Sequence, residues 1–272
     1  MFQAYEGGLW LQPSLLWQTQ CAVLAGDGAV LVVDPGYFPE EIERAQRLAA
    51  DLDKPGRDPL LVLTHSDFDH IVGVPHFPTA PVVASARWDT RNEARARRAL
   101  RNFDGLHYIA RDRPLDAPVR PDRPIAADGE ELAGCRFYLL RGHTWDGLAI
   151  FHPPSGALIV GDYLSDCEFP FIYVSALAYR ETLEKLAELN RQLAPRLLVS
   201  QHGRPAEGRP AIEGRIDEAR RYLDLLLAGV ATASGPRELA DATLGAWRDG
   251  VPDYILHYHR RNARVAWREL RR

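Results

Sequence analysis

Histidines and aspartates gather in four short clusters of this 272-residue chain, at residues 65–70, 142–144, 161–162 and 201–203. The first cluster reads His-Ser-Asp-Phe-Asp-His, and the other three contain one histidine or aspartate each. A set that combines imidazoles and carboxylates suits Zn, Fe or Mn better than Ca or Mg. Seven such side chains are too many for one tetrahedral ion, but they are enough for two ions that share a bridging carboxylate.

Each cluster directly follows a short apolar segment that is predicted to be a buried strand. These segments lie at residues 60–63, 136–140, 157–160 and 197–200. Loops at the ends of strands, held by a rigid sheet, are where α/β proteins place their active sites. The pattern therefore predicts one active site built from strand ends.

The remaining segments complete an alternating pattern of strands and helices. Further strands are expected at residues 20–25, 29–33, 81–84 and 149–152, and an Asp-Gly pair joins the first two as a hairpin. Helical periodicity or composition favours helices at residues 39–50, 86–101, 179–193, 211–229, 237–249 and 253–272. The proline-containing stretch 109–124 is interpreted as the seam between two halves of one domain.

The composition is that of a globular protein, with 46% hydrophobic and 26% charged residues. Lysine and arginine total 33 against 37 aspartates and glutamates, and a net charge of −4 argues against a surface built wholly for nucleic acid. Three cysteines make no disulfide framework. The chain shows no export signal and no apolar run of the length a membrane helix needs, so we expect a cytoplasmic protein without a membrane partner.

The ordered set of clusters resembles the metallo-β-lactamase-fold hydrolases over about residues 4–225. That family carries His-x-His-x-Asp-His after a strand, then a distant His, an Asp in a Gly-Asp pair, and a final His. The matching positions are His65, Asp67, Asp69, His70, His143, Asp162 and His202. The resemblance implies a mixed α and β fold, a four-layer αββα sandwich with the metals at one edge. We expect residues 1–230 to form this domain, with 231–272 as a helical extension packed on it.

The resemblance also implies a role for each matched residue. The first of two divalent ions would be held by His65, Asp67 and His143, the second by Asp69, His70 and His202, with Asp162 as the bridge. A hydroxide between the ions would be the nucleophile, because two divalent ions lower its pKa toward neutrality. Asp69 is the expected catalytic residue, which orients that water or protonates the leaving group.

Asp67 departs from the family pattern, which usually has His at this position. With Asp67, two divalent ions, three carboxylates and a hydroxide sum to a neutral centre, which attracts anionic substrates less strongly. Zn is the expected metal, and the added carboxylate makes Fe or Mn the alternative. A carboxylate here also resembles the diiron branch of the fold. The alternative for Asp67 is a cap on the helix that follows.

We therefore predict a hydrolase of a small neutral ester, thioester or lactone. The alternatives are a diiron redox or oxygen-sensing protein and a phosphodiesterase or nuclease, the last suggested by the arginine-rich helix 86–101. Binding to nucleic acid is the less favoured interpretation, because few aromatic residues that could stack on bases lie among the arginines. Residues 231–272 are expected either to cap the site or to form a homodimer interface. The predicted pocket residues are Trp145, Tyr163 and Tyr37, for which sheet core is the alternative.

Overall fold

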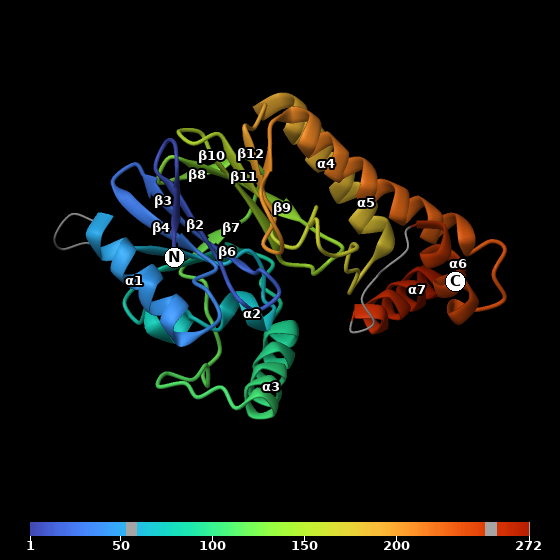
Figure 1. Cartoon of the computed structure of the whole chain (residues 1–272), viewed down its shortest axis with the longest axis horizontal. Helices are drawn as coiled ribbons and strands as arrows, with labels where there is room; N and C mark the ends of the chain where they lie inside the picture. Colours follow the sequence, from blue (N-terminus) through green and yellow to red (C-terminus); the bar gives the residue numbers. More distant parts are fainter. Residues whose placement is uncertain (53–58, 248–254, 272) are drawn as a thin grey trace.

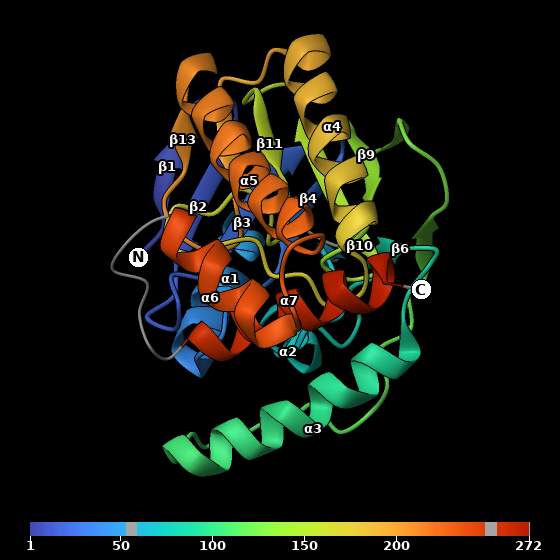
Figure 2. The same ribbon diagram turned by 90° about the vertical axis from the view of Figure 1, so that its right-hand side faces the viewer.

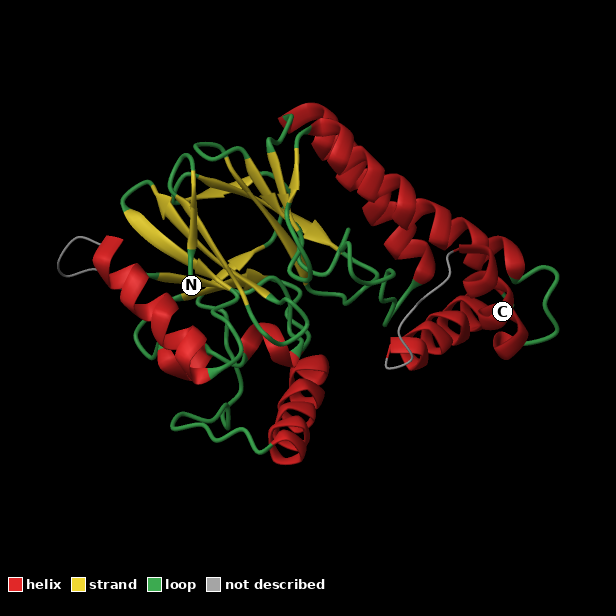
Figure 3. Ribbon diagram, in the orientation of Figure 1, coloured by secondary structure: helices red, strands yellow, loops and turns green. Residues whose placement is uncertain are grey.

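The structure is a computed structural model that describes residues 1–52, 59–247 and 255–271. Two β-sheets pack face to face, and helices lie on their outer faces (Figures 1 and 3). Helix α1 (Pro39–Leu52) packs on the first sheet, while α4 (Ala176–Leu193) and α5 (Arg209–Gly229) lie over the second. The order of layers is helix, sheet, sheet, helix, which confirms the predicted αββα sandwich.

The first sheet contains seven strands, and their order in space follows their order in the chain. They are β1 (Gln3–Tyr5), β2 (Leu9–Pro13), β3 (Gln20–Gly26), β4 (Ala29–Val33), β5 (Leu60–Val62), β6 (Val82–Ser85) and β7 (Arg123–Ile125). Neighbours are antiparallel from β1 to β4 and parallel from β4 to β7. The parallel half requires crossovers, and α1 and α3 (Thr90–His107) lie in two of them.

The second sheet contains six strands. In spatial order they are β13 (Ala206–Glu207), β12 (Leu197–Val199), β11 (Ala157–Ile159), β10 (Gly147–His152), β9 (Cys135–Leu140) and β8 (Glu130–Leu132). All pairs are antiparallel except β11 with β12, which are joined through α4. The chain passes between the sheets after β7, at the end of the stretch predicted to be the seam.

The core between the sheets follows from strand periodicity. In β3, Ala22 and Leu24 face the second sheet, whereas Cys21 and Val23 face the helical layer on the other side. Successive side chains of a strand point to opposite faces, so a strand buried on both faces is apolar throughout. The same arrangement brings the carboxyl ends of β5, β11 and β12 to one edge of the sandwich.

Helix α3 begins at Thr90, four residues later than predicted, and ends at His107. Asp89 explains the start, because its side chain accepts hydrogen bonds from the backbone N–H groups of Arg91 and Asn92. Such a cap satisfies donors that have no partner within the helix. Figure 2 shows α3 extending along the lower side of the molecule, where it packs against α2.

The chain closes with α6 (Pro236–Trp247) and α7 (Leu256–Leu270), and two short helices complete the fold. Helix α6 packs against α5 and α7, and α7 also contacts α4. The short helices are α2 (Phe68–Ile71) and the 3-10 turn η1 (Val74–His76). Parts of the helices predicted at 237–249 and 253–272 fall outside the described residues. No helix in the described ranges is long and apolar enough to cross a membrane.

Candidate metal centre

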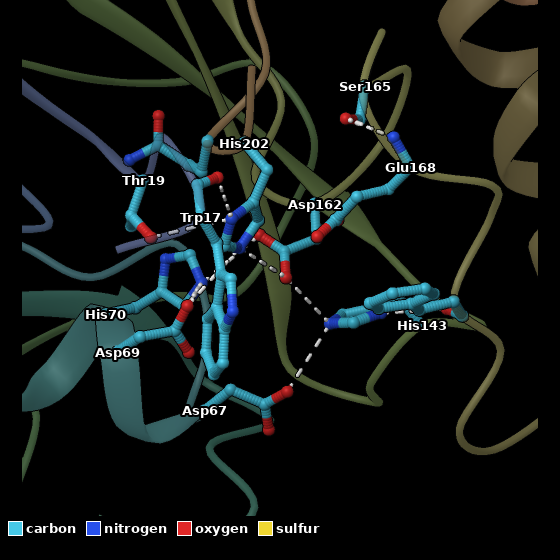
Figure 4. A network of polar contacts seen from close by, with 12 residues as sticks. Trp17, Thr19, Asp67, Asp69, His70, His143, Asp162, Ser165, Glu168 and His202 are labelled. Atoms are coloured by element: carbon cyan, nitrogen blue, oxygen red, sulfur yellow. Dashed lines mark hydrogen bonds and ion pairs between the residues drawn. The ribbon is translucent and has the colours of Figure 1, made fainter. Parts of the chain in front are cut away.

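The four clusters meet at one edge of the sandwich, as Figure 4 shows. In each case the strand ends three residues before the first cluster ligand: β5 before His65, β9 before His143, β11 before Asp162 and β12 before His202. Asp69 and His70 lie in α2, and Asp67 occupies the position just before it. The structure therefore brings all seven predicted side chains together.

Gly142 allows the loop after β9 to present His143. Its φ is +116°, a conformation that side chains rarely adopt. A Cβ at this position would also lie 2.3 Å from the backbone nitrogen of Tyr179 in α4. The glycine in the Gly-His pair is thus required by the close approach of α4.

A first group of ligand atoms comes from His65, Asp67 and His143. Oδ2 of Asp67 lies 3.5 Å from Nε2 of His143 and 3.8 Å from Nε2 of His65. The two Nε2 atoms are 3.2 Å apart. Ligands bound at about 2.0–2.1 Å around a tetrahedral ion lie about 3.4 Å from one another. The three side chains are therefore spaced as one ion requires.

A second group comes from Asp69, His70 and His202. Oδ2 of Asp69 lies 3.3 Å from Nε2 of His202 and 3.5 Å from Nε2 of His70. All three residues are buried, and they also have the spacing of a metal site. Because an unpaired carboxylate is costly to bury, such a cluster needs a compensating cation or proton.

Asp162 lies between the two groups. Its Oδ2 is 3.3 Å from Nε2 of His143, 3.4 Å from that of His202 and 3.5 Å from that of His65. Its Oδ1 is 3.2 Å from Nε2 of His70. One carboxylate thus faces imidazoles of both groups, which is the position that a bridging ligand must occupy.

All four histidines direct Nε2 into the centre because Nδ1 is engaged elsewhere. The Nδ1 partners are Phe171 O for His143 (2.8 Å), Trp17 O for His202 (3.2 Å), Thr64 Oγ1 for His65 (3.1 Å) and Asp34 Oδ2 for His70 (2.9 Å). Since a carbonyl or carboxylate accepts, Nδ1 of His70, His143 and His202 must carry a proton, and Nε2 of each is free to face an ion. Metal-binding histidines are oriented in this way.

Asp34 supports two of these histidines and was not identified from the sequence. Its fully buried carboxylate accepts from the backbone N–H of Thr64 (2.9 Å), the hydroxyl of Thr64 (2.6 Å), the amide of Gln201 (2.7 Å) and Nδ1 of His70. Because the Thr64 hydroxyl donates to Asp34, its oxygen accepts from His65. The one sequence feature that could have identified Asp34 is its position at the end of a strand, which it shares with the candidate ligands.

The electrostatics of the site favour positive charge. Burial opposes protonation of His143, but the carboxylates of Asp162 and Asp67 outweigh it and raise the pKa of His143 to about 10. Burial likewise opposes ionisation of Asp67 and Asp162, yet the imidazoles around them hold the pKa of both carboxyls below the usual range. Bound cations would take the place of the protons that these pKa shifts favour.

The donor set fits divalent ions. Nε2 of His70 and Oδ1 of Asp162 are buried and face each other, yet neither has a hydrogen-bond partner among the described residues. Buried polar atoms are normally paired, and a shared ion would satisfy both. Imidazole nitrogens with carboxylate oxygens are ligands of Zn, Fe and Mn.

A cavity of about 660 Å³ opens onto this centre, with Asp69, Asp162 and His202 in its lining. Aromatic rings form two walls: Trp17, Phe68 and Phe103 on one side, and Phe171, Tyr173 and Tyr258 on the other. The first wall includes α2 and α3, and the second joins the loop after Asp162 to α7. The aromatic packing makes this a preformed apolar pocket beside a polar floor.

The three aromatic residues predicted for the pocket are not in the lining of this cavity. Tyr37 is fully buried and donates its hydroxyl to Asp104, and Tyr163 is buried with its oxygen accepting from the backbone N–H of His143. Trp145 is 42% exposed. The half-buried Glu168 does line the cavity, and desolvation raises the pKa of its carboxyl to about 7. No sequence pattern singled out Glu168.

A His/Asp centre at the strand ends of an αββα sandwich defines the class of metallo-β-lactamase-fold proteins. Residues 15–195, about two thirds of the chain, match the family model of the metallo-beta-lactamase superfamily. The chain therefore belongs to the metallo-beta-lactamase superfamily. His202 follows the matched span and completes the same site. A comparison with curated proteins found no match.

Solved structures share the fold at low sequence identity. A metallo-beta-lactamase family protein from Thermus thermophilus is 22% identical, with a TM-score of 0.67 over 97% of this chain and 93% of that one. The sec-alkylsulfatase Pisa1 from Pseudomonas sp. is 16% identical, with a TM-score of 0.69 over 98% of this chain, which spans 50% of the sulfatase. TTHA1623 in a di-iron-bound form is 21% identical, with a TM-score of 0.52 over 76% of this chain and 97% of that one.

Proposed function

We propose that this protein is a metal-dependent hydrolase of a neutral, apolar ester, thioester or lactone. The lining of the cavity above the metal centre carries this proposal. Six aromatic rings surround the space, and no lysine or arginine of the described ranges is among the lining residues; the guanidinium of Arg261 lies 3.9 Å from the centre of the Tyr173 ring without joining the lining. A site built for a phosphodiester or another anion would place cations beside the reacting group. The pocket instead offers apolar surface to an uncharged substrate.

We infer a part in this reaction for each side chain of the two ligand groups. Bound divalent ions supply a hydroxide near neutral pH and polarise the substrate carbonyl. His65, Asp67 and His143 would hold one ion and Asp69, His70 and His202 the other, with Asp162 between them. Asp69 belongs to the second group and also lines the cavity, so its carboxylate could orient a water molecule toward the substrate.

The charge of the centre agrees with an uncharged substrate. Two divalent ions, the carboxylates of Asp67, Asp69 and Asp162, and a hydroxide sum to zero. The usual histidine in place of Asp67 would leave one positive charge. A neutral centre gives an anionic substrate no long-range attraction, while Lewis-acid activation of a carbonyl is retained.

A substrate panel with a defined metal tests the proposal. The protein is purified without added metal, its metals are measured by elemental analysis, and the same ion is then restored. Esters, thioesters and lactones of one acyl size are compared with a phosphodiester and an alkyl sulfate of similar size. We expect turnover of the neutral group to exceed that of the anions. Metal-loaded protein that hydrolyses only the phosphodiester or the sulfate would refute the substrate class.

A diiron redox protein is the second candidate. Three carboxylates among seven donors favour iron over zinc, and TTHA1623, which shares the fold, is described in a di-iron-bound form. Protein purified with iron would then show iron-dependent visible absorption and would consume oxygen when a reductant is added. Oxygen consumption in the absence of any hydrolytic activity would favour this function over the first.

A further inference from the structure

Asn92, in the first turn of α3, reaches across to the ligand that distinguishes this site. Its side-chain nitrogen donates to Oδ1 of Asp67 at 2.8 Å and to the hydroxyl oxygen of Ser66 at 2.9 Å. Both amide hydrogens are therefore used on the segment between His65 and α2. We propose that Asn92 is a positioning residue that fixes Asp67 as a one-oxygen ligand of the first metal site.

The geometry divides the two oxygens of Asp67 between two tasks. Oδ1 is held by Asn92, and Oδ2 faces Nε2 of His143 at 3.5 Å and Nε2 of His65 at 3.8 Å. Because Oδ1 is engaged by a donor, only Oδ2 is directed at the ion position. A histidine at this position would offer one donor atom with a fixed direction. The hydrogen bond from Asn92 likewise leaves the shorter aspartate with one donor atom in a fixed direction.

The alternative use of Asp67 is ruled out by its own contacts. Asp67 occupies the capping position of α2 with an extended backbone (φ −74°, ψ 154°), yet its side chain makes no capping hydrogen bond. An aspartate there would ordinarily turn toward the free N–H groups of the helix. In this structure it turns toward Asn92 and the imidazoles instead. The hydrogen bond from Asn92 thus selects the ligand orientation over the capping one.

Asn92 is itself held in place by the carboxylate of Asp89, which is in turn anchored by Asp146. Oδ1 of Asp89 accepts from the backbone N–H of Asn92 at 3.0 Å. The backbone N–H of Asp89 in turn donates to Oδ2 of Asp146 at 3.0 Å, and Asp146 is fully buried. This chain of hydrogen bonds ties the start of α3 to the loop after β9 that carries His143. Supporting partners held in this way keep a ligand within the narrow geometry that an ion requires.

The proposal rests on the metal centre proposed above and on no particular substrate. It predicts that Asn92→Ala weakens binding at the first site, with little effect on the second site of Asp69, His70 and His202. Loss of a supporting partner costs roughly 10–100-fold in metal affinity. Arg95→Ala is the matched control, because Arg95 is exposed one turn further along α3 and belongs to neither ion group.

A double-mutant cycle with Asp67→His separates positioning from a general effect on α3. Metal affinity is measured by competition of Zn²⁺ and Mn²⁺ with a chromophoric chelator, with circular dichroism as the check on folding. Asn92→Ala should lower first-site affinity in the Asp67 protein and leave it unchanged in the Asp67→His protein, which lacks the carboxylate that Asn92 holds. Equal losses in both backgrounds, or no loss in either, would overturn the proposal. A wild-type protein that binds no divalent ion would instead refute the metal centre itself.

Discussion

Asp34 and His70 form a buried pair in which Oδ2 of the carboxylate lies 2.9 Å from Nδ1 of the ring. On the other side of the same ring, Nε2 faces Oδ1 of Asp162 at 3.2 Å. The imidazole is thus held between a carboxylate that orients it and a carboxylate that shares its ion position. Because Asp34 also fixes Thr64, which orients His65, one residue outside the ligand set controls two ligands.

Replacing Asp34 should therefore damage metal binding and folding together. Asp34→Ala leaves the buried donors of Thr64, Gln201 and His70 without an acceptor, and we expect a loss of about 3 kcal/mol in the free energy of unfolding. Metal affinity should fall at both sites. Asp34→Asn, which keeps the shape and one acceptor oxygen, should lose less stability. Urea unfolding and chelator competition measure the two effects; an Asp34→Ala protein of wild-type stability would contradict this account.

In the proposed centre, Asp162 and His143 would differ in how many ions they contact. Asp162→Ala should reduce bound metal at both sites and abolish hydrolysis, because this carboxylate faces both groups of histidines. His143→Ala should empty the first site and leave the second occupied, also without activity. Elemental analysis after gel filtration gives the stoichiometry, and Asp128→Ala, an exposed carboxylate bonded to Lys185, serves as control. Full metal content in either ligand variant would show that the assignment is wrong.

Asp67 should determine which ion is preferred. In Asp67→His, a carboxylate oxygen is replaced by an imidazole nitrogen, so the protein should still hold two ions but bind Zn more strongly relative to Fe and Mn. Competition between equimolar Zn, Fe and Mn, followed by elemental analysis, measures the shift. If the ratio of bound metals is the same in both proteins, the charge and hardness of Asp67 do not set metal preference.

The convergence of the seven candidate side chains could be predicted because each is a chemically distinctive residue shortly after an apolar strand. Strand ends converge at a sheet edge, so order along the chain was enough to place His65, His143, Asp162 and His202 near one another. Asp34 occupies the same kind of position, after β4. The sequence Asp-Pro-Gly indicated only a turn, because its role depends on Thr64 and Gln201, whose side chains approach it only in the folded protein.

Local sequence patterns could not predict the pocket or the edge strands of the sheets. The walls of the pocket combine Trp17, Phe103 and Tyr258, which are distant in the chain and meet only through the packing of α3 and α7 around the site. The strands β1, β2, β7, β8 and β13 are two to five residues long and contain no apolar run of four or more residues, so only their pairing with neighbouring strands defines them.

The aromatic walls make a separate prediction about substrate size. Phe103→Ala and Tyr258→Ala remove one ring from each wall, and each should raise KM for a long-chain or aromatic ester roughly 10-fold, the equivalent of partial loss of one buried side chain. For an acetyl ester, which does not fill the cavity, KM should change little. Trp145→Ala tests the alternative pocket predicted from sequence and should leave both values unchanged. A larger effect of Trp145→Ala than of the other two would place the substrate elsewhere.

His259 makes stability depend on pH through the C-terminal helices. Its ring joins three helices: Nδ1 lies 2.8 Å from the hydroxyl of Tyr222 in α5, and Nε2 lies 2.7 Å from the carbonyl oxygen of Ala240 in α6. Burial lowers the pKa of His259, the carbonyl of Ala240 and the charge of Asp241 oppose this, and Arg260 adds to it. The ring therefore takes up a proton less readily in the folded protein than a free imidazole does.

The sign of the effect follows from proton linkage. In the unfolded chain this histidine binds a proton below about pH 6.5, whereas the folded protein resists doing so until a lower pH. The unfolded state then holds more protons, so the stabilisation present above pH 6.5 is lost as the pH falls through the lowered pKa. His259→Gln, which can still donate to Ala240, should flatten the dependence of unfolding free energy on pH by up to about 1.4 kcal/mol per pH unit.

Urea unfolding of both proteins at pH 5.0–7.5, in the same metal-loaded state, isolates this contribution, because the metal ligands are common to both. Parallel curves for the two proteins would show that His259 does not couple protonation to the packing of α5, α6 and α7.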